Sequence, residues 1–398
     1  WLSSMTATLR KERLSSLLSL SYNRTDGNVD NFDYKEASGY GKIAYELSDR
    51  WRATADYTLM NFIGNDPIYP KLSNPESTAI YHQNVTRGEA SLAVSNDYGP
   101  TSGPARVYYS YGNHYIDDPR HFHSLDDRLG VMLYQGFIPW RGAMAHAGFD
   151  FNSYSGKIPM SGGNAHTPGS KATMDRKTIT EYSPYVTLEQ RLELGEANLF
   201  INGGVRMSNS DKFDTRWIPQ GGLSFVTGRW TVKASASMGY RNPSFRELYL
   251  YAMANPDLAP ERMWNYEVSL TQRLLGGRFM YGVNIFYIDG SNMIVTVPRE
   301  GATPLNMNTG KIDNAGIELE ASYHINTSWH VSANYSFLHM ENPVIAAPEH
   351  KLYAGANFTQ GRWSVSTGIQ YIAGLYTSTD PATTEDFVLW NLRGQFRA

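Results

Sequence analysis

Two methionines and a histidine share one glycine-rich segment of the sequence. Met160, His166 and Met174 lie within residues 155–177, which read SGKIPMSGGNAHTPGSKATMDRK. Soft thioether ligands together with an imidazole suit copper or a haem iron. The alternative, which we favour from the composition, is a connecting loop whose methionines bind nothing.

A second ligand pattern is the H-x-H motif formed by His121 and His123. In an extended segment, residues two positions apart face the same side, so the two imidazoles can chelate one metal ion. The surrounding sequence offers no evident third ligand. We therefore interpret the motif as part of a solvated loop and predict no metal site.

An aromatic segment carries the main binding candidates. Tyr249, Tyr251 and Met253 alternate along a short stretch, with Arg246 just before them and Arg241 further upstream. Aromatic rings can stack on a flat ligand, and guanidinium groups can pair with an anionic one. A tyrosine can also be an axial ligand of haem iron. A structural cap of the loop explains the same residues, so both interpretations stay open.

The sequence shows no signature of an enzyme. It has no G-x-S-x-G nucleophile motif, no H-E-x-x-H, no Walker loop and no dinucleotide fingerprint. The net charge of -3 gives no basic stripe for nucleic acid, and cysteine is absent, so nothing depends on disulfides. We predict neither catalysis nor nucleic-acid binding.

Tight polar turns followed by an aromatic residue recur along the chain. After the turn at 48–50, apolar Trp51, Ala53, Ala55 and Tyr57 alternate with polar residues, as in a strand with one apolar face. The aromatic residues that open strands in this way are Trp51, Trp230, Phe279, Trp329 and Trp363. Amphipathic rings at one end of successive hairpins are typical of a membrane-interface girdle. A soluble β-sandwich or solenoid is the alternative.

About nineteen strands can be placed, and their connections alternate in length. Short turns such as 194–196 and 359–362 alternate with predicted long loops at 61–80, 155–177, 241–262 and 372–384. No run of about eighteen apolar residues exists, so no transmembrane helix is expected. Short turns opposite long loops indicate an all-β fold, a transmembrane antiparallel β-barrel with short periplasmic turns and long extracellular loops.

The strand predicted at 143–154 has a lipid-facing and an inward-facing set of residues. Ala145, Ala147, Phe149 and Phe151 form its lipid-facing set. The opposite, inward-facing set consists of Met144, His146, Asp150 and Asn152. We interpret these inward residues as contacts to a domain inside the barrel. An odd strand count cannot close such a barrel, which favours a fragment cut at both ends.

Two motifs in series resemble a known family. Residues 240–248 read YRNPSFREL and residues 255–261 read NPDLAPE. Together they resemble the paired boxes of TonB-dependent outer-membrane receptors. Downstream, residues 308–320 (NTGKIDNAGIELE) and 347–352 (APEHKL) resemble later strands of the same family, and residues 217–220 (WIPQ) resemble the strand that precedes the boxes.

The resemblance implies a barrel of twenty-two strands around an N-terminal plug. Residues 1–398 would then be a partial barrel, with the plug, the first strand and the last two strands missing. It implies a bacterial outer-membrane receptor for a scarce nutrient, most simply a ferric siderophore or similar iron chelate. The implied partners are the TonB complex, through the missing N-terminal segment, and outer-membrane lipid and lipopolysaccharide. No covalently bound cofactor is expected.

Two alternatives to the iron chelate stay open. The first is haem or cobalamin as the ligand of the same kind of receptor. Haem receptors of this family usually carry a histidine between the boxes, where this chain has none. The second is a passive porin, which would lack both the plug and the paired boxes.

Overall fold

The fold is described from a computed structural model of the chain, covering residues 1–28, 30–67, 80–117, 122–160, 173–250 and 252–397. Within these ranges it contains nineteen strands, one short α-helix and one 3-10 turn. The first strands are β1 (Leu2–Lys11), β2 (Leu14–Thr25), β3 (Tyr34–Ser48), β4 (Trp51–Pro67), β5 (Ile80–Asp97), β6 (Thr101–Asp117), β7 (Phe122–Phe137), β8 (Ala143–Met160), β9 (Met174–Leu194) and β10 (Ala197–Ser210). The remaining elements are β11 (Arg216–Val226), β12 (Trp230–Arg241), α1 (Phe245–Tyr249), β13 (Glu261–Leu274), η1 (Leu275–Gly277), β14 (Phe279–Arg299), β15 (Ala302–His324), β16 (Trp329–Met340), β17 (Pro348–Gln360), β18 (Trp363–Thr379) and β19 (Ala382–Phe396).

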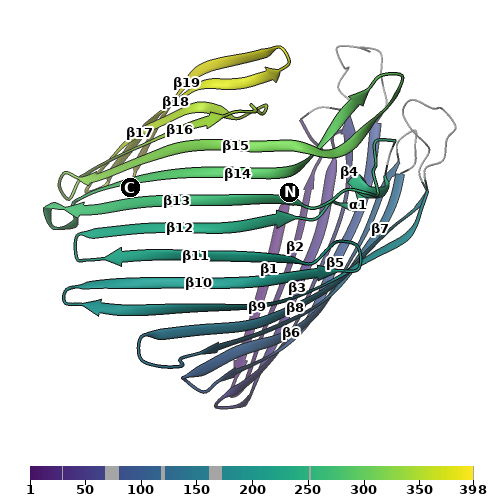
Figure 1. Cartoon of the computed structure of the whole chain (residues 1–398), viewed down its shortest axis with the longest axis horizontal. Coiled ribbons are helices and arrows are strands. Elements are labelled where there is room, and N and C mark those ends of the chain that lie inside the picture. Colours follow the sequence, from purple (N-terminus) through teal and green to yellow (C-terminus); the bar gives the residue numbers. More distant parts are fainter. Residues whose placement is uncertain (29, 68–79, 118–121, 161–172, 251, 398) are drawn as a thin grey trace.

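All strands belong to one antiparallel sheet in which each strand pairs with the next along the chain. The first ladder joins β1 to β2 and the last joins β18 to β19. The sheet curls strongly, so that β9 to β15 lie in front of the steeply inclined β1 to β6 (Figure 1). No ladder among the described residues joins β1 to β19, and every residue of both strands is exposed. The expected count of nineteen strands is confirmed.

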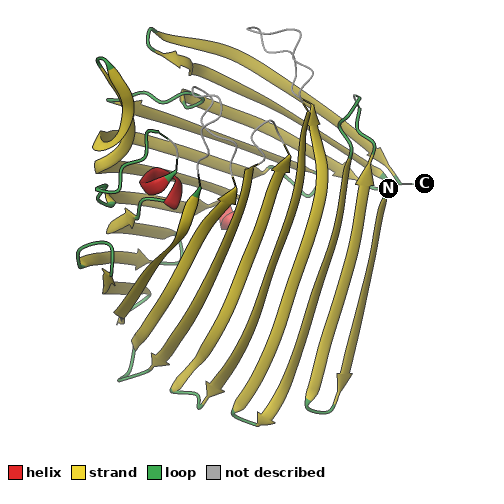
Figure 2. Cartoon of the chain, turned by 90° about the vertical axis from the view of Figure 1, so that its right-hand side faces the viewer, coloured by secondary structure: helices red, strands yellow, loops and turns green. Residues whose placement is uncertain are grey.

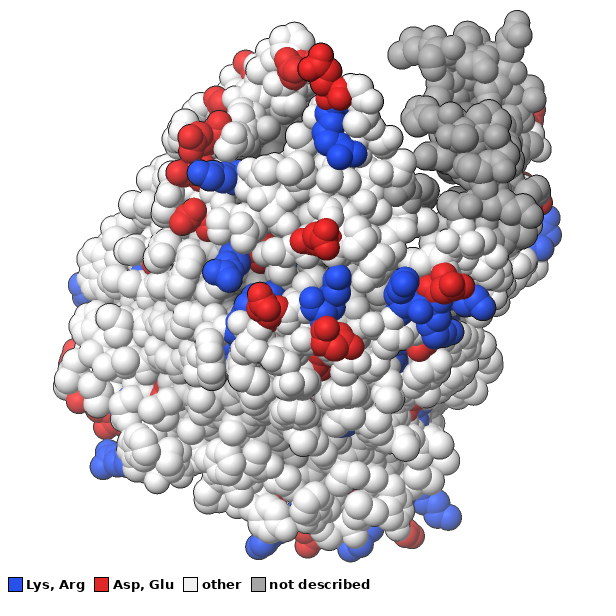
Figure 3. Space-filling model, turned by 45° about the vertical axis from the view of Figure 1, so that its right-hand side comes forward, with Lys and Arg blue, Asp and Glu red and all other residues white. Residues whose placement is uncertain are grey.

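The two faces of the sheet differ as the alternation predicted. One continuous row across four strands pairs Leu223 with Ala234, then Val268, then Ile285. Val268 is 55% exposed and Ile285 is 56% exposed, although both are large and apolar. Figure 3 shows a broad area with few charged side chains, bounded by charged groups at its lower margin and in its upper part. Exposed apolar side chains on this scale fit a surface that faces lipid.

Tight turns gather at one end of the barrel and longer connections at the other (Figure 2). We call these the turn end and the loop end. The five predicted girdle residues Trp51, Trp230, Phe279, Trp329 and Trp363 each begin a strand at the turn end. No helix in the described ranges is long and apolar enough to cross a membrane.

One predicted loop is wrong. We expected a long connection at 372–384, but β18 continues to Thr379 and β19 begins at Ala382. The register shifts between Ile372 and Leu375 and again before Ser378. A glycine with positive φ at Gly374 and these irregularities disturb the alternation without ending the strand. The turn-like composition therefore marks a bulged strand here.

Candidate functional site

The loop between β12 and β13, residues 242–260, carries both family-like boxes, and we call it the box loop. Its helix α1 begins with a capping box, which the sequence S-x-x-E encodes. Ser244 Oγ accepts a hydrogen bond from the backbone N–H of Glu247 at 3.2 Å. The Glu247 carboxylate in turn accepts one from the backbone N–H of Ser244 at 2.7 Å. This exchange fixes a helix of only five residues.

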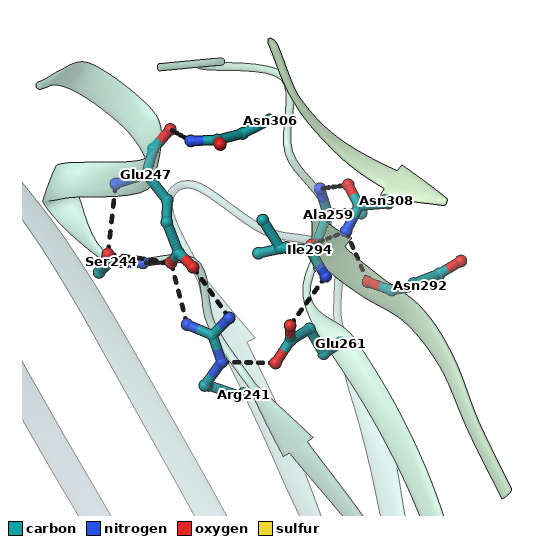
Figure 4. Close-up of polar contacts among 9 residues, drawn as sticks. All are labelled: Arg241, Ser244, Glu247, Ala259, Glu261, Asn292, Ile294, Asn306 and Asn308. Atoms are coloured by element: carbon teal, nitrogen blue, oxygen red, sulfur yellow. Dashed lines mark hydrogen bonds and ion pairs between the residues drawn. The ribbon is translucent and has the colours of Figure 1, made fainter. Parts of the chain in front are cut away.

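Arg241 joins the two boxes (Figure 4). Its two terminal nitrogens donate to the two carboxylate oxygens of Glu247 at 2.9 and 3.0 Å. Its Nε donates to Glu261, at the end of the second box, at 2.5 Å. These hydrogen bonds from Arg241, with those from Ser244, lower the pKa of the Glu247 carboxyl to about 2. The bidentate fork makes Arg241 a structural clamp.

Hydrogen bonds between side chains and the backbone tie the box loop to β15 and the start of β13 to β14. Glu261 Oε1 accepts from the Ile294 backbone N–H at 2.9 Å. Asn306 donates through its side chain to the Glu247 carbonyl at 3.3 Å. Asn308 bridges the carbonyls of Ala259 and Asn292 at 2.7 and 2.8 Å. The loop is therefore held by β15, and Glu261 at its end is held by β14 (Figure 4).

A small apolar core lies beneath the box loop. It consists of the buried residues Ile179, Phe213, Leu248 and Leu258, with Tyr154, Phe245, Tyr249 and Ile294 packed against them. Leu248 is 0% exposed. A Cβ at Gly156 of β8 would lie 3.2 Å from the Phe245 ring, so glycine there allows the close approach. The box loop thus packs like a small soluble domain against the barrel wall.

The predicted ligand-binding residues of this segment occupy different environments. Tyr249 is half-buried, with its ring centroid 6.1 Å from that of Phe245 and 5.5 Å from Lys177 Nζ. Arg246 is exposed on α1, and Met253 is 37% exposed while its carbonyl accepts from Asn306 N at 2.8 Å. Tyr251 lies outside the described residues. The structure brings Tyr249 and Lys177 together, and sequence reasoning missed Lys177.

The predicted methionine and histidine group is only partly described. Met174 is buried, and its methyl group lies 3.7 Å from a Cβ built at Gly156. Met160 ends β8, its side chain is not described, and His166 lies outside the described residues. Within the described ranges, no three histidine or acidic side chains are grouped so as to hold a metal ion.

The H-x-H motif is also described only in part. His121 lies outside the described residues. His123 Nε2 lies 2.9 Å from Asn113 Oδ1, and its ring meets Tyr115 edge-on with the centroids 5.9 Å apart. His123 of β7 therefore contacts Asn113 and Tyr115 of the neighbouring strand β6.

The inward wall of β6 to β10 carries hydrogen-bonded charged and polar side chains. Asp150 accepts from Arg206 at 2.5 Å, and Asn152 accepts from Arg128 at 2.6 Å. His146 lies 3.3 Å from the Thr187 hydroxyl, and Met144 is exposed on the same face. The predicted inward set thus shares one face and contacts neighbouring strands.

Tyrosine rings lie flat on this wall over glycines of adjacent strands. A Cβ at Gly130 would meet the Tyr108 ring at 2.2 Å, and one at Gly148 would meet the Tyr185 ring at 2.1 Å. The Arg106 and Arg128 guanidinium groups each lie 5.6 Å from the Tyr108 centroid. Sequence reasoning missed these pairs, although a glycine inside a strand is a signal of close approach.

The chain forms an antiparallel barrel with an apolar outer face, paired inward charges and a clamped loop at one end. This architecture is that of the outer-membrane receptors and transporters. The family model described as "TonB dependent receptor-like, beta-barrel" matches residues 5–398. The chain belongs to this family, whose members lie in the outer membrane of Gram-negative bacteria.

Curated relatives match over part of the chain. It is 29% identical over 145 residues to a vitamin B12 transporter, BtuB, of Photobacterium profundum, a match that covers 35% of the chain and 23% of the relative. It is 25% identical over 234 residues to an iron-regulated outer membrane virulence protein of Vibrio cholerae, covering 50% of the chain and 35% of the relative. The matches therefore span less than two thirds of either relative.

Solved structures share the fold over the whole chain. The ferric enterobactin receptor PfeA of Pseudomonas aeruginosa superposes with a TM-score of 0.80 at 14% identity, covering 100% of this chain and 70% of that one. The siderophore receptor PirA of the same species gives 0.76 at 13% identity, covering 100% and 70%. The copper transporter OprC gives 0.74 at 15% identity, covering 100% and 71%.

Proposed function

We propose that the chain forms the barrel of a receptor that takes up a ferric siderophore or similar iron chelate, using energy relayed by the TonB complex. The observation that carries this proposal is the surface of the box loop. Tyr249 packs against the apolar core but is only partly buried, and Lys177 Nζ lies 5.5 Å from its ring centroid. Arg246, three positions earlier on α1, is exposed. A partly exposed ring with a cation against it and a second cation on the same helix suits an anionic aromatic chelate.

Some of the relatives are named for iron or iron chelates. One is named as iron-regulated, one solved structure is a siderophore receptor and another is a ferric enterobactin receptor. The box loop, held by its own hydrogen bonds, adds a physical reason to expect a ligand-binding receptor. A pre-organised binding surface loses less conformational entropy when a ligand binds. A passive porin would lack the paired boxes that form this loop.

The test replaces Tyr249 and Tyr251 by alanine together in the full receptor. We expect ferric chelate binding to weaken by about tenfold or more, with barrel assembly intact, because stacking contacts are lost. The matched control replaces Tyr45 and Tyr109, which are exposed on the outward face, and should leave binding unchanged. Unchanged uptake on iron, haem and cobalamin sources would remove these tyrosines from the site.

Cobalamin is the second candidate, because the relative with the higher identity is a vitamin B12 transporter. A bulky corrin could rest on the same aromatic surface. Growth of the double variant on defined sources separates the two ligands. A defect confined to cobalamin would overturn the iron assignment.

A further inference from the structure

Two histidine rings lie against each other across the β15–β16 hairpin. His324 is the last residue of β15, His330 is the second residue of β16, and the two are directly opposite in the ladder. Their ring centroids are 4.4 Å apart, with the ring planes at 36°. Residues opposite each other on one face of an antiparallel pair are close enough to share a ligand.

Both rings lie on the inward face of the barrel, at the turn end. The outward row that contains Ile285 continues to Ile317 of β15 and Phe337 of β16. Side chains alternate along a strand, so the odd-numbered positions of β15 face outward and His324 faces inward. His330 is opposite His324 and faces inward too. The turn end is the periplasmic side of such barrels, so the pair lies at the periplasmic end of the lumen.

The turn between the two histidines is fixed by its own hydrogen bonds. Asn326 Oδ1 accepts from the backbone N–H groups of Ser328 and Trp329, at 2.9 Å each. The Ile325 N–H donates to the Trp329 carbonyl at 3.0 Å. An Asn side chain bonded in this way holds a tight turn. The two rings are therefore brought together before any ligand binds, which lowers the entropic cost of binding.

A serine orients one of the rings. Ser322 Oγ lies 2.9 Å from His330 Nε2, which leaves Nδ1 of that ring for a ligand. A hydrogen bond between the second ring nitrogen and an oxygen acceptor is the usual support of a histidine that binds a metal ion. His324 is exposed, and no hydrogen bond engages its ring within the described ranges.

The distance between the rings suits one ion bound by both. Each ring turns about its Cβ–Cγ bond and can point a nitrogen at the ion. A ring nitrogen lies about 1.2 Å from the ring centre and binds a metal at about 2.0 Å, so each centre would lie about 3.2 Å from the ion. Centres 4.4 Å apart then enclose an angle of about 90° at the ion. That is the angle of a square-planar or tetragonal Cu²⁺ site, whereas tetrahedral Zn²⁺ needs about 109°.

The neighbouring strand supplies a thioether. Met280 of β14 is opposite Ser322 in the ladder, so it is the diagonal neighbour of His324 on the inward face. Imidazole nitrogens with a soft thioether beside them suit copper. Arg273 of β13 follows in the same row, one strand further from the two rings.

We propose that His324 and His330 bind a Cu²⁺ ion at the periplasmic end of the barrel lumen. The two imidazoles supply neighbouring corners of a tetragonal site, and water completes it, with Met280 beside it. The ion ties the end of β15 to the start of β16. The site lies at the opposite end of the barrel from the box loop, and the proposal does not depend on which nutrient the receptor takes up.

The test titrates Cu²⁺ into the purified full receptor, with calorimetry and electron paramagnetic resonance as readouts. We expect a bound ion whose spectrum shows coupling to two ring nitrogens. His324→Asn should bind Cu²⁺ about tenfold or more weakly and lose the two-nitrogen signal, because one of the two protein ligands is removed. The control His123→Asn with His339→Asn removes two histidines of other strands and should keep both affinity and signal. The same affinity and spectrum in His324→Asn and in the control would overturn the proposal.

Thermal unfolding separates loss of the ion from a folding defect. Without metal, His324→Asn should unfold at the wild-type temperature. Cu²⁺ should raise the unfolding temperature of the wild type, because an ion that binds only the folded hairpin stabilises it, and should leave that of His324→Asn unchanged. An equal rise in both proteins would contradict the site. If Zn²⁺ at the same concentration binds as tightly as Cu²⁺, the tetragonal copper assignment is overturned.

Discussion

The box loop and the barrel wall are stabilised in different ways. Under the box loop, four buried side chains form a core, and Arg241 satisfies two carboxylates at once. On the wall, outward side chains such as Val268 and Ile285 remain more than half exposed. The loop therefore carries its own core, as a soluble domain does, whereas the wall depends on its backbone ladders and on surrounding lipid.

Removing the Arg241 clamp should produce the largest effect. Arg241→Met leaves the Glu261 carboxylate, which is 7% exposed, without a cation, and we expect a cost of roughly 3–5 kcal/mol in the box loop. Limited proteolysis of the full receptor should detect cleavage within 242–260. Arg24→Met, which breaks the exposed pair with Asp26, is the control and should cost less than about 1 kcal/mol. Equal resistance of both variants would contradict the clamp.

Charges on the two faces of the wall should have unequal effects. Ala234→Arg places a cation on the outward face at mid-strand, where we expect a cost of about 2–4 kcal/mol. Ser235→Arg, the next residue, faces inward and should be much milder. Refolding into lipid, monitored by denaturant titration, measures both. Equal costs would refute the assignment of the faces.

Enlarging the glycines under the inward rings should cost less. Gly148→Ala puts a methyl group within 2.1 Å of the Tyr185 ring, so the ring must move, and overpacking of this kind costs about 1–3 kcal/mol. Gly41→Ala is the matched control, because nothing lies within 4 Å of its Cβ position. Thermal unfolding of both variants compares them. A control as destabilised as Gly148→Ala would point to backbone effects alone.

Acid should loosen the box loop gradually. The pKa of Glu247 is lowered to about 2 from its ordinary 4.5, so the folded loop binds this proton less tightly than the opened loop. The stabilisation is therefore complete above pH 4.5 and is lost as the pH falls toward 2. Proteolysis by an acid-active protease across this range measures it. In Glu247→Gln the dependence should flatten, and a loop that stays equally resistant at every pH would contradict the assignment.

Much of the wall could be predicted from the sequence, because alternation is a local property. Trp51, Ala53 and Ala55 reveal one strand face without any knowledge of the neighbouring strand. The glycine–tyrosine pairs could not be predicted, since Gly148 meets Tyr185 only through the register of β8 and β9. The bulged end of β18 was predicted wrongly for a related reason. A register shift between strands appears in the sequence only as turn-like residues.

The box loop was located by its motifs, but its clamp was not. The S-x-x-E pattern predicts the capping box at Ser244 from local sequence. The contact of Arg241 with Glu261 joins residues twenty positions apart and depends on the pairing of β12 with β13.

Hydrogen exchange of the full receptor tests the contrast between loop and wall most directly. The reporters are the backbone amides of Leu248 and Asn255 in the box loop, together with those of Lys233 and Ser269 in the β12–β13 ladder. Arg241→Met should release the box-loop amides and leave the ladder protected, whereas Ala234→Arg should do the reverse. If either variant loosens both regions to the same extent, the loop and the wall are one cooperative unit and the contrast is wrong.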